Sequence, residues 1–204
     1  MEKALAEIKL SVLLCGLYER MVIYGDGVAS DGDDLLRTLH QQADGKPVEI
    51  LYLMDNMKMS VGRKRNILLA IAQGEWIAFV DDDDEVAVDY VDQLLGAIDV
   101  AGDAGVICFP QTCHHADTGE VETCTYGLSL PYSKQGTQWT GLPAHTQCWR
   151  TEAVQGIEFP EQNFQEDTGW VAKAVTAVSK EYRIEVDHPL YVYRFDPKTS
   201  RTRG

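Results

Sequence analysis

The feature that most restricts the fold of this 204-residue chain is an alternation of apolar and amphipathic segments in its first half. Short runs rich in leucine and β-branched residues occur in "KLSVLLCG", "VEILYLMD", "EWIAFV" and "GVICFP", and each is typical of a buried strand. Between them, "DDLLRTLHQQADG", "VGRKRNILLAIAQG" and "DYVDQLLGAIDVAG" have the leucine spacing and glycine ends of helices. This order predicts a parallel sheet with helices on its faces.

The second half of the chain follows a different pattern. The region from Cys113 to Trp139 has no helical period and predicts short antiparallel strands or loops. After it, "EDTGWVAKAVTAVSK" predicts an amphipathic helix, and "YRIEVDHPLYVYRF" predicts one or two strands. We see no repeat or linker, so we expect one α/β domain over residues 1–204, with a Rossmann-like half (1–110) joined to a mixed half (111–204).

Composition narrows the classes of function. The formal net charge of −14 disfavours general affinity for nucleic acid or anionic membranes, because a local basic face would have to overcome the repulsion. The five cysteines form no CxxC pair, which predicts free thiols and does not favour a zinc site. There is neither an apolar run of transmembrane length nor the pattern of a signal peptide, so we expect a cytoplasmic protein without a transmembrane segment.

Four consecutive aspartates follow the third predicted strand, in "WIAFVDDDDEV". Ligands of open parallel sheets bind beyond the carboxyl ends of the strands, where "DDDDE" and "MDN" would both lie. Adjacent carboxylates repel one another unless something offsets their charge, and hard divalent cations prefer carboxylate oxygens. Residues two apart in an extended segment share a face, so Asp81 and Asp83 would point into one site. Asp82 and Asp84 would face solvent or support the loop. The pattern predicts a metal–diphosphate site, and the alternative is a solvated loop that caps the next helix.

Two further charged segments need an explanation. "VGRKRN" puts Arg63, Lys64 and Arg65 at a helix N-terminus, where cations oppose the helix dipole unless an anion is present. We interpret this segment as a phosphate or diphosphate receptor, the alternative being an exposed first turn. "QEDTGW" puts Glu166 and Asp167 in a first helical turn, where carboxylates are also favoured simply as caps.

The segments "SVLLCGLYER … VEILYLMDN … SVGRKRN … GEWIAFVDDDDEV … FPEQNFQEDTGW … PLYVYR" together resemble family 2 glycosyltransferases of the GT-A fold. "GEWIAFVDDDD" is similar to the family's strand and DxD signature, and "QEDTGW" sits where the family has its ED motif. The resemblance covers essentially the whole chain and implies a compact, tail-less type. It implies transfer of a sugar from a nucleoside-diphosphate sugar, foremost a UDP-sugar, to an acceptor hydroxyl with inversion, and a Mn²⁺ or Mg²⁺ cofactor.

The resemblance also implies roles for individual residues. On the donor side, Asp55 would contact the base, Arg65 the diphosphate and Asp81 the ribose. The metal would be held by Asp83 together with Asp81. Asp167 would be the catalytic base, and Glu166 would hold it or the acceptor. The first loop, "LYERMVIYGDG", is longer than the family's usual turn, and it offers Glu19 and Arg20 as further donor contacts.

Several alternatives stay open. The acceptor is a glycan, a lipid, a protein or a modified DNA base, the last being known from some phage enzymes. A nucleotidyltransferase would carry a glycine-rich basic loop after the first strand, which "CGLYERMVIYGDG" matches poorly. A non-catalytic Ca²⁺-binding module would need spaced ligands that "DDDDEV" lacks. A GT-A-like module that binds nucleotide or metal without turnover stays open. His145 and His188 have no identifiable partner. The aromatic residues of the second half either pack in the core or stack on a sugar: Tyr126, Trp139, Trp149 and Trp170.

Overall fold

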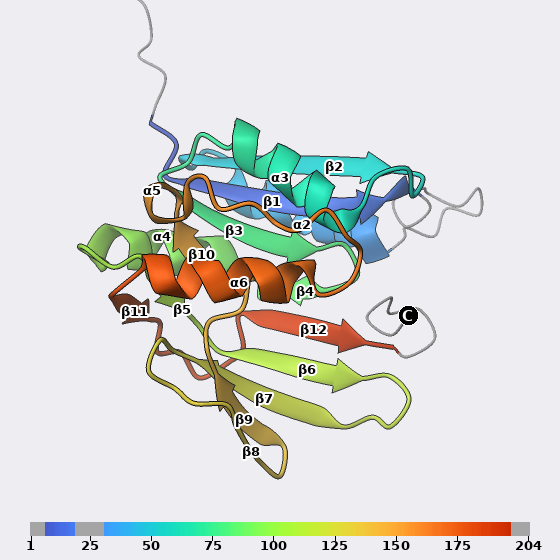
Figure 1. Cartoon of the computed structure of the whole chain (residues 1–204), viewed down its shortest axis with the longest axis vertical. Helices are drawn as coiled ribbons and strands as arrows, with labels where there is room; N and C mark the ends of the chain where they lie inside the picture. Colours follow the sequence, from blue (N-terminus) through green and yellow to red (C-terminus); the bar gives the residue numbers. More distant parts are fainter. Residues whose placement is uncertain (1–6, 19–30, 197–204) are drawn as a thin grey trace, which may run out of the picture.

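The computed structural model describes residues 7–18 and 31–196, which form two six-stranded sheets (Figure 1). In spatial order, sheet A consists of β11 (Glu181–Arg183), β5 (Val106–Cys108), β10 (Cys148–Arg150), β3 (Trp76–Asp81), β1 (Leu10–Leu17) and β2 (Val48–Asp55). The central strand β1 pairs in parallel with both β2 and β3, and β11 pairs in parallel with β5. The predicted parallel sheet is therefore confirmed, and Figure 1 shows the carboxyl ends of β1, β2 and β3 at one edge.

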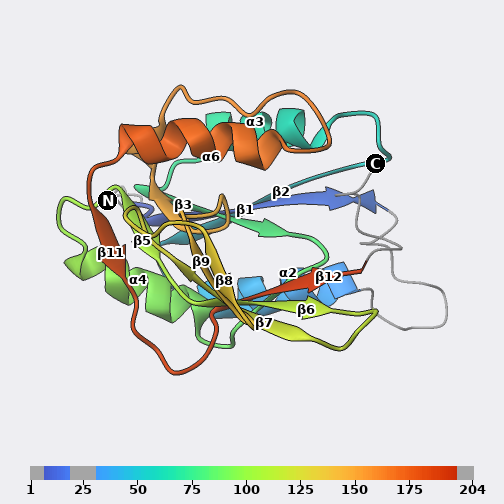
Figure 2. The same cartoon turned by 60° about the horizontal axis from the view of Figure 1, so that its bottom comes forward.

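The predicted helices cover both faces of sheet A. Figure 2 shows α3 (Val61–Ile71) and α6 (Glu166–Ala177) on one face, and α2 (Asp31–Ala43) and α4 (Tyr90–Val100) on the other. A short helix, α5 (Thr151–Val154), follows β10. Successive residues of β1 serve the two faces in turn, because Val12 and Leu14 pack with the α2–α4 core and Leu13 and Cys15 with the α3–α6 core. Burial on both faces explains why the strand reads as a continuous apolar run.

Sheet B is built mostly from the second half of the chain. Its spatial order is β4 (Glu85–Val86), β12 (Tyr191–Phe195), β6 (Gln111–His115), β7 (Val121–Tyr126), β9 (Gln138–Gly141) and β8 (Ser133–Gln135). The short strands predicted in this half are present. They are not all antiparallel, because β12 pairs in parallel with β6, and β7 with β9. The "YRIEVDHPLYVYRF" segment forms two strands in different sheets.

Strand β10 is the element that periodicity missed. It has only three residues and lies antiparallel between β3 and β5, in the middle of sheet A. A segment this short carries no measurable alternation, and its place is set by long-range burial of Cys148 and Trp149.

Most of the aromatic residues of the second half belong to the core. Trp170 stacks on Phe159 at 4.8 Å between ring centroids, and Trp149 meets Trp170 edge-on at 5.3 Å. Trp149 and Trp170 are fully buried and Tyr126 is buried, so core packing explains all three. Trp139 is only half-buried. No helix in the described part of the chain is long and apolar enough to cross a membrane.

Candidate functional site

The aspartate run makes a tight turn at the carboxyl edge of sheet A. β3 ends at Asp81, and the N–H of Asp84 donates to the Asp81 carbonyl at 3.2 Å, which closes the turn. A cavity of about 160 Å³ opens beside it. Its lining comes from the ends of β1 and β3, from α3 and from the start of α6, and its charged members are Lys64, Arg65, Asp81, Asp82, Asp83 and Glu166. Of the two strand ends that the sequence placed at this edge, the end of β3 lines the cavity, whereas β2 contributes only through Met57 and Met59 of the loop that follows it.

Asp82 and Asp84 hold this turn in place. Asp82 is 6% exposed and accepts a hydrogen bond from the N–H of Leu17 at 2.9 Å, which ties the turn to β1. Asp84 is 4% exposed and accepts from the Tyr191 hydroxyl at 2.5 Å and from the Arg194 N–H at 2.8 Å, which ties it to β12. The expectation that they support the loop is confirmed, and solvent exposure is excluded. Asp83 lines both the main cavity and a second one of about 290 Å³ beside α2, whereas Asp82 lines only the first of these and Asp84 only the second.

Arg65 joins the two acidic motifs. Its guanidinium donates to Asp81 Oδ1 at 2.6 Å and to Glu166 Oε1 at 2.7 Å. Both pairs are largely shielded from water, since Arg65 is 3% exposed and Glu166 is buried. One side chain from α3 thus fixes the end of β3 against the start of α6. Its Nε is buried and finds no hydrogen-bond partner among the described residues, and Arg65 lines the cavity, so an anion bound there could accept this N–H.

Lys64 connects the ends of β1 and β2. Its ammonium donates to the Gly16 carbonyl at 2.8 Å and to Asp55 Oδ1 at 3.1 Å. Asp55 also accepts from the N–H groups of Lys58 and Met59, at 2.7 and 2.6 Å. Burial alone would raise the pKa of Asp55, but the Met59 N–H and Lys64 outweigh it and hold the pKa below its usual value. Asp55 therefore organises the loop after β2, and it is not among the described residues that line the cavity.

The N-terminus of α3 is occupied by the chain itself. Val61 N–H donates to Asn163 Oδ1 at 3.0 Å, Gly62 N–H to the Gln162 carbonyl at 3.1 Å, and the Arg63 N–H to its cap Ser60 at 3.2 Å. Gly62 permits this close approach, because a Cβ there would lie 1.9 Å from the Pro160 carbonyl oxygen.

The prediction that this helix N-terminus receives a phosphate is therefore wrong for its backbone N–H groups. The first-turn N–H groups already have partners. Of the three cations, Lys64 and Arg65 are buried against carboxylates, and Arg63 is exposed. Buried carboxylates, which the local sequence does not contain, supply the anions that the basic turn requires.

Hydrogen bonds fix the segment before α6, and the first two residues of the helix, Glu166 and Asp167, face different surroundings. The Asn66 side chain donates to the Phe159 carbonyl at 2.9 Å and accepts from the Phe159 N–H at 2.8 Å. Gln165 then takes a left-handed conformation, with φ of 59°, directly before the helix. As a result, Glu166 is buried against Arg65, whereas the side chain of Asp167 is 42% exposed.

His145 is a site residue whose partners the sequence did not reveal. Its Nε2 lies 3.5 Å from Asp81 Oδ2, and its Nδ1 lies 3.8 Å from Asp167 Oδ2. The ring is buried, 6.2 Å from the ring of Phe79. The "GLPAHTQCW" segment leads into β10, and the position of β10 in sheet A brings His145 next to Asp81 and Asp167. The sequence could not predict this position, because it did not predict β10.

Arg65 and burial set the charges of the carboxylates. Burial would raise the pKa of Asp81, but the Arg65 guanidinium and His145 hold it well below its usual range. For Glu166, burial outweighs Arg65 and raises the pKa above its usual value. Burial and the charges of Asp81 and Asp83 raise the pKa of Asp84 well above 3.8. Asp81 is thus held in its ionised form, whereas folding favours the protonated form of Asp84.

Because its pKa is raised on folding, Asp84 should make the protein less stable as pH rises. Its contribution is fully present below pH about 4 and is lost as pH rises through the folded-state pKa. We expect Asp84→Asn, measured with a chelator present, to match the wild type in free energy of unfolding at pH 4 and to exceed it at pH 7. Urea unfolding between these pH values tests this. If the free energies of unfolding of the two proteins ran parallel against pH, folding would not raise the pKa of Asp84.

His188, the other histidine that the sequence singled out, lies outside this cluster. His188 contacts Asp89 at 3.0 Å and Asp187 at 3.1 Å, which raises its pKa and attaches the loop before β12 to the start of α4. His188 therefore has a structural partner and no link to the cavity lining. Glu19 and Arg20 lie outside the described residues.

Solved structures with a similar fold support the expected architecture. S. aureus TarS 1–349 in complex with UDP-GlcNAc matches with a TM-score of 0.61 and 17% sequence identity, over 92% of this chain and 58% of that chain. The UDP complex of the same TarS segment matches with a TM-score of 0.58 and 17% sequence identity, over 93% of this chain and 61% of that chain. A third S. aureus TarS structure matches with a TM-score of 0.57 and 16% sequence identity, over 92% of this chain and 37% of that chain. This chain thus spans less than two thirds of those chains. The likeness confirms the GT-A fold.

Sequence comparison identifies the family. A search of curated proteins returned no significant match. The sequence profile described as Glycosyl transferase family 2 matches residues 14–152, which is more than half of the chain and includes the aspartate turn, Arg65 and His145. The chain therefore belongs to glycosyl transferase family 2.

Proposed function

We propose that this chain is a metal-dependent, inverting glycosyltransferase that moves a sugar from a UDP-sugar to an acceptor hydroxyl. One observation carries the proposal: the end of β3 and the start of α6 meet at a cavity, joined by Arg65 on one side and by His145 on the other. Family membership and the likeness to TarS structures in complex with UDP-GlcNAc and with UDP support the donor class.

The donor would lie in the cavity at the carboxyl edge of sheet A. There Lys64 and Arg65 provide positive potential that is already in place before the diphosphate binds. The unpartnered Nε–H of Arg65 is the donor best suited to a phosphate oxygen. Asp81 would remain close to the ribose, because Arg65 and the Tyr191 hydroxyl hold its side chain and its backbone N–H.

The aspartate turn fits a hard divalent cation. Its carboxylate oxygens are the ligands that Mn²⁺ and Mg²⁺ prefer. Asp83 would hold the ion, since it lines both cavities. Asp81 has one route to the ion, through Oδ2, because Oδ1 is bonded to Arg65. When bound, the ion would neutralise the charge that develops on the leaving diphosphate.

Asp167 would accept the proton of the attacking hydroxyl. It is the exposed carboxylate of the pair, and its Oδ1 is engaged by the N–H of Thr168 at 2.7 Å, so Oδ2 is the oxygen that faces His145 and the site. Glu166, buried against Arg65, would hold the helix start in position. A single in-line displacement with the base opposite the leaving group inverts the anomeric centre.

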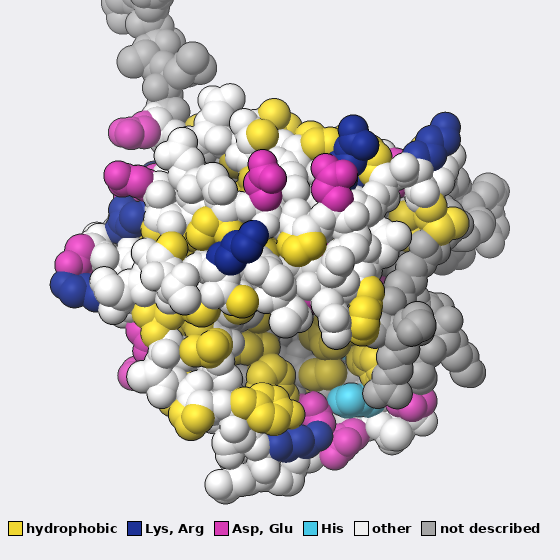
Figure 3. Space-filling view, in the orientation of Figure 1, with side chains coloured by type: hydrophobic (Ala, Val, Ile, Leu, Met, Phe, Trp, Pro, Cys, Tyr) yellow, Lys and Arg dark blue, Asp and Glu magenta, His cyan; other side chains and the backbone are white. Residues whose placement is uncertain are grey.

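The acceptor would approach over sheet B. Figure 3 shows a hollow below α6 in which hydrophobic side chains gather. At the outer strands, Trp139 is half-buried, and Tyr132, 6.4 Å from it between ring centroids, is exposed. These rings could stack on a sugar face. A glycan, lipid, protein or modified DNA base acceptor would each fit the proposed chemistry.

Donor binding should stabilise the protein in a metal-dependent way. At a ligand concentration of 100 times Kd, we expect about 2.7 kcal/mol of stabilisation. A thermal-shift screen of UDP-, GDP-, dTDP- and CMP-linked sugars, each with and without Mn²⁺, measures it. We expect the UDP-sugar to give the largest shift, and only with the metal.

Asp83→Ala tests the metal site, and Asp44→Ala is its matched control. Asp44 is exposed in the turn before β2, at the opposite edge of the sheet, so its replacement should leave the shift unchanged. Asp83→Ala should abolish the metal-dependent part. An equal shift in both variants, or no shift with any nucleotide, would exclude the metal–diphosphate site.

A further inference from the structure

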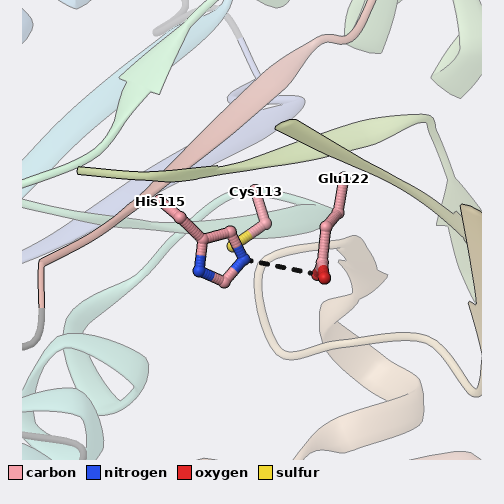
Figure 4. Close-up of side chains that lie close together, drawn as sticks. All are labelled: Cys113, His115 and Glu122. Atoms are coloured by element: carbon pink, nitrogen blue, oxygen red, sulfur yellow. Dashed lines mark hydrogen bonds and ion pairs between the residues drawn. The ribbon is translucent and has the colours of Figure 1, made fainter. Parts of the chain in front are cut away.

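Three side chains of sheet B that do not belong to the aspartate turn lie close together: Cys113, His115 and Glu122. His115 Nε2 lies 3.5 Å from Cys113 Sγ and 3.5 Å from Glu122 Oε2 (Figure 4). One ligand atom from each residue lies within 4.8 Å of the other two. A thiol, an imidazole and a carboxylate in such proximity form a mixed donor set that the proposed transfer reaction does not use.

The two strands themselves create this convergence. β6 and β7 are antiparallel, and their register sets Cys113 directly opposite Glu122. Residues two apart on a strand share a face, so His115 joins Cys113 on the buried side while His114 is exposed on the other. The three positions are thus fixed by a hydrogen-bonded ladder. A cross-strand site of this kind has no CxxC spacing, which is why the sequence did not favour zinc.

Two of the three separations between ligand atoms match a tetrahedral metal centre, and the third, from Cys113 to Glu122, is within 4.8 Å. Zn²⁺ binds sulfur at about 2.3 Å and nitrogen or oxygen at about 2.0–2.1 Å, which gives ligand-to-ligand edges of roughly 3.3–3.6 Å in a tetrahedron. The two 3.5 Å separations fall in this range. A cysteine nucleophile activated by a histidine is a poorer fit, because Cys113 and Glu122 approach the same ring nitrogen. Such a triad needs the thiol and the carboxylate on opposite nitrogens.

Neighbouring side chains support the ligands. Lys134 pairs with Glu122 Oε1, which orients the carboxylate and leaves Oε2 toward His115. The Phe195 ring packs edge-on against the His115 ring at 5.3 Å and restricts its rotation. Metal binding would replace the proton of the Cys113 thiol, because the thiolate is the form that binds a metal.

We propose that Cys113, His115 and Glu122 bind one Zn²⁺ ion, separately from the cation of the aspartate turn. Sulfur and imidazole ligands select zinc over Mg²⁺ or Mn²⁺. Three protein ligands leave one position of the tetrahedron for water or for a group of a bound ligand. The ion would link β6 to β7 on the face of sheet B that also carries Tyr193, a residue of the donor cavity.

Titration of the whole chain with Co²⁺, followed by displacement with Zn²⁺, tests the proposal by absorption spectroscopy. A thiolate ligand gives a sulfur-to-cobalt charge-transfer band, and tetrahedral Co²⁺ absorbs much more strongly in the visible than octahedral Co²⁺. We expect one equivalent with both signatures. Cys113→Ser should remove the charge-transfer band. His115→Gln and Glu122→Gln should weaken binding at least about tenfold, since even outer-shell changes cost about 10- to 100-fold.

The controls separate this site from other metal binding. His114→Gln on the same strand and Cys108→Ser in sheet A should keep the band and the affinity. Asp83→Ala should also keep them, which distinguishes this site from the aspartate turn. Should Cys113→Ser fail to fold, the half-buried His115 carries the test. A wild-type spectrum without the charge-transfer band, a band that survives in Cys113→Ser, or unchanged affinity in His115→Gln would overturn the proposal.

Discussion

Replacing Asp167 with asparagine should lower the rate of sugar transfer by about 10²–10⁴-fold, the range typical of losing a general base. Donor binding should be unchanged, because Asp167 is not among the described residues that line the donor cavity. The asparagine keeps the oxygen that accepts from the Thr168 N–H, so the first turn of α6 should stay intact. Steady-state kinetics with a UDP-sugar should therefore show a loss in kcat at a constant donor KM.

Glu161→Gln is the matched control for Asp167→Asn. Glu161 is exposed on the loop before α6, and the substitution removes one negative charge at a similar place in the chain without touching His145 or Arg65. It should transfer sugar at the wild-type rate. Wild-type transfer by Asp167→Asn would show that another group takes the proton. An equal loss in both variants would point to net charge rather than base chemistry.

The sheet and the aspartate turn could be predicted from the sequence because each rests on a local pattern. The apolar runs of β1 and β3 are buried on both faces of the sheet and leave an unmistakable composition. The alternation along the turn is confirmed only in part, because Asp81 and Asp83 line the cavity as expected but Asp82 lines it too, besides accepting from the Leu17 N–H. Both patterns extend over only a few residues of the chain.

What the sequence could not show depends on contacts between distant segments. Arg65 reads as one of three surface cations, but its charge is matched by Asp81 and Glu166, from β3 and α6. His145 becomes a site residue only through β10, a strand too short to have a period. The pairing of Cys113 with Glu122 likewise follows from the register of two strands. Such partners are set by topology, which local spacing does not encode.

Arg65→Met should cost about 3–5 kcal/mol of stability, the range for removing one partner of a buried ion pair. Methionine fills similar space but leaves Glu166 buried without its cation and removes the partner of Asp81 Oδ1. Urea unfolding at pH 7 measures the loss. The deficit should shrink as pH falls toward about 4, because the two carboxyls then bind protons in the folded variant and no longer need a cation. A second substitution, Glu166→Gln, should restore part of the stability at pH 7.

Arg63→Met distinguishes this buried bridge from a general effect of removing positive charge from α3. Arg63 lies in the same helical turn but is exposed, so its loss should change stability by no more than about 0.5 kcal/mol. The loss of stability in Arg65→Lys should fall between those of Arg63→Met and Arg65→Met, because a single ammonium cannot bond both carboxylates in the planar geometry of a guanidinium. If Arg65→Met unfolds like Arg63→Met, then Asp81 and Glu166 are held by other contacts. In that case Arg65 is placed in the cavity for its ligand, and its loss should appear in donor affinity instead of stability.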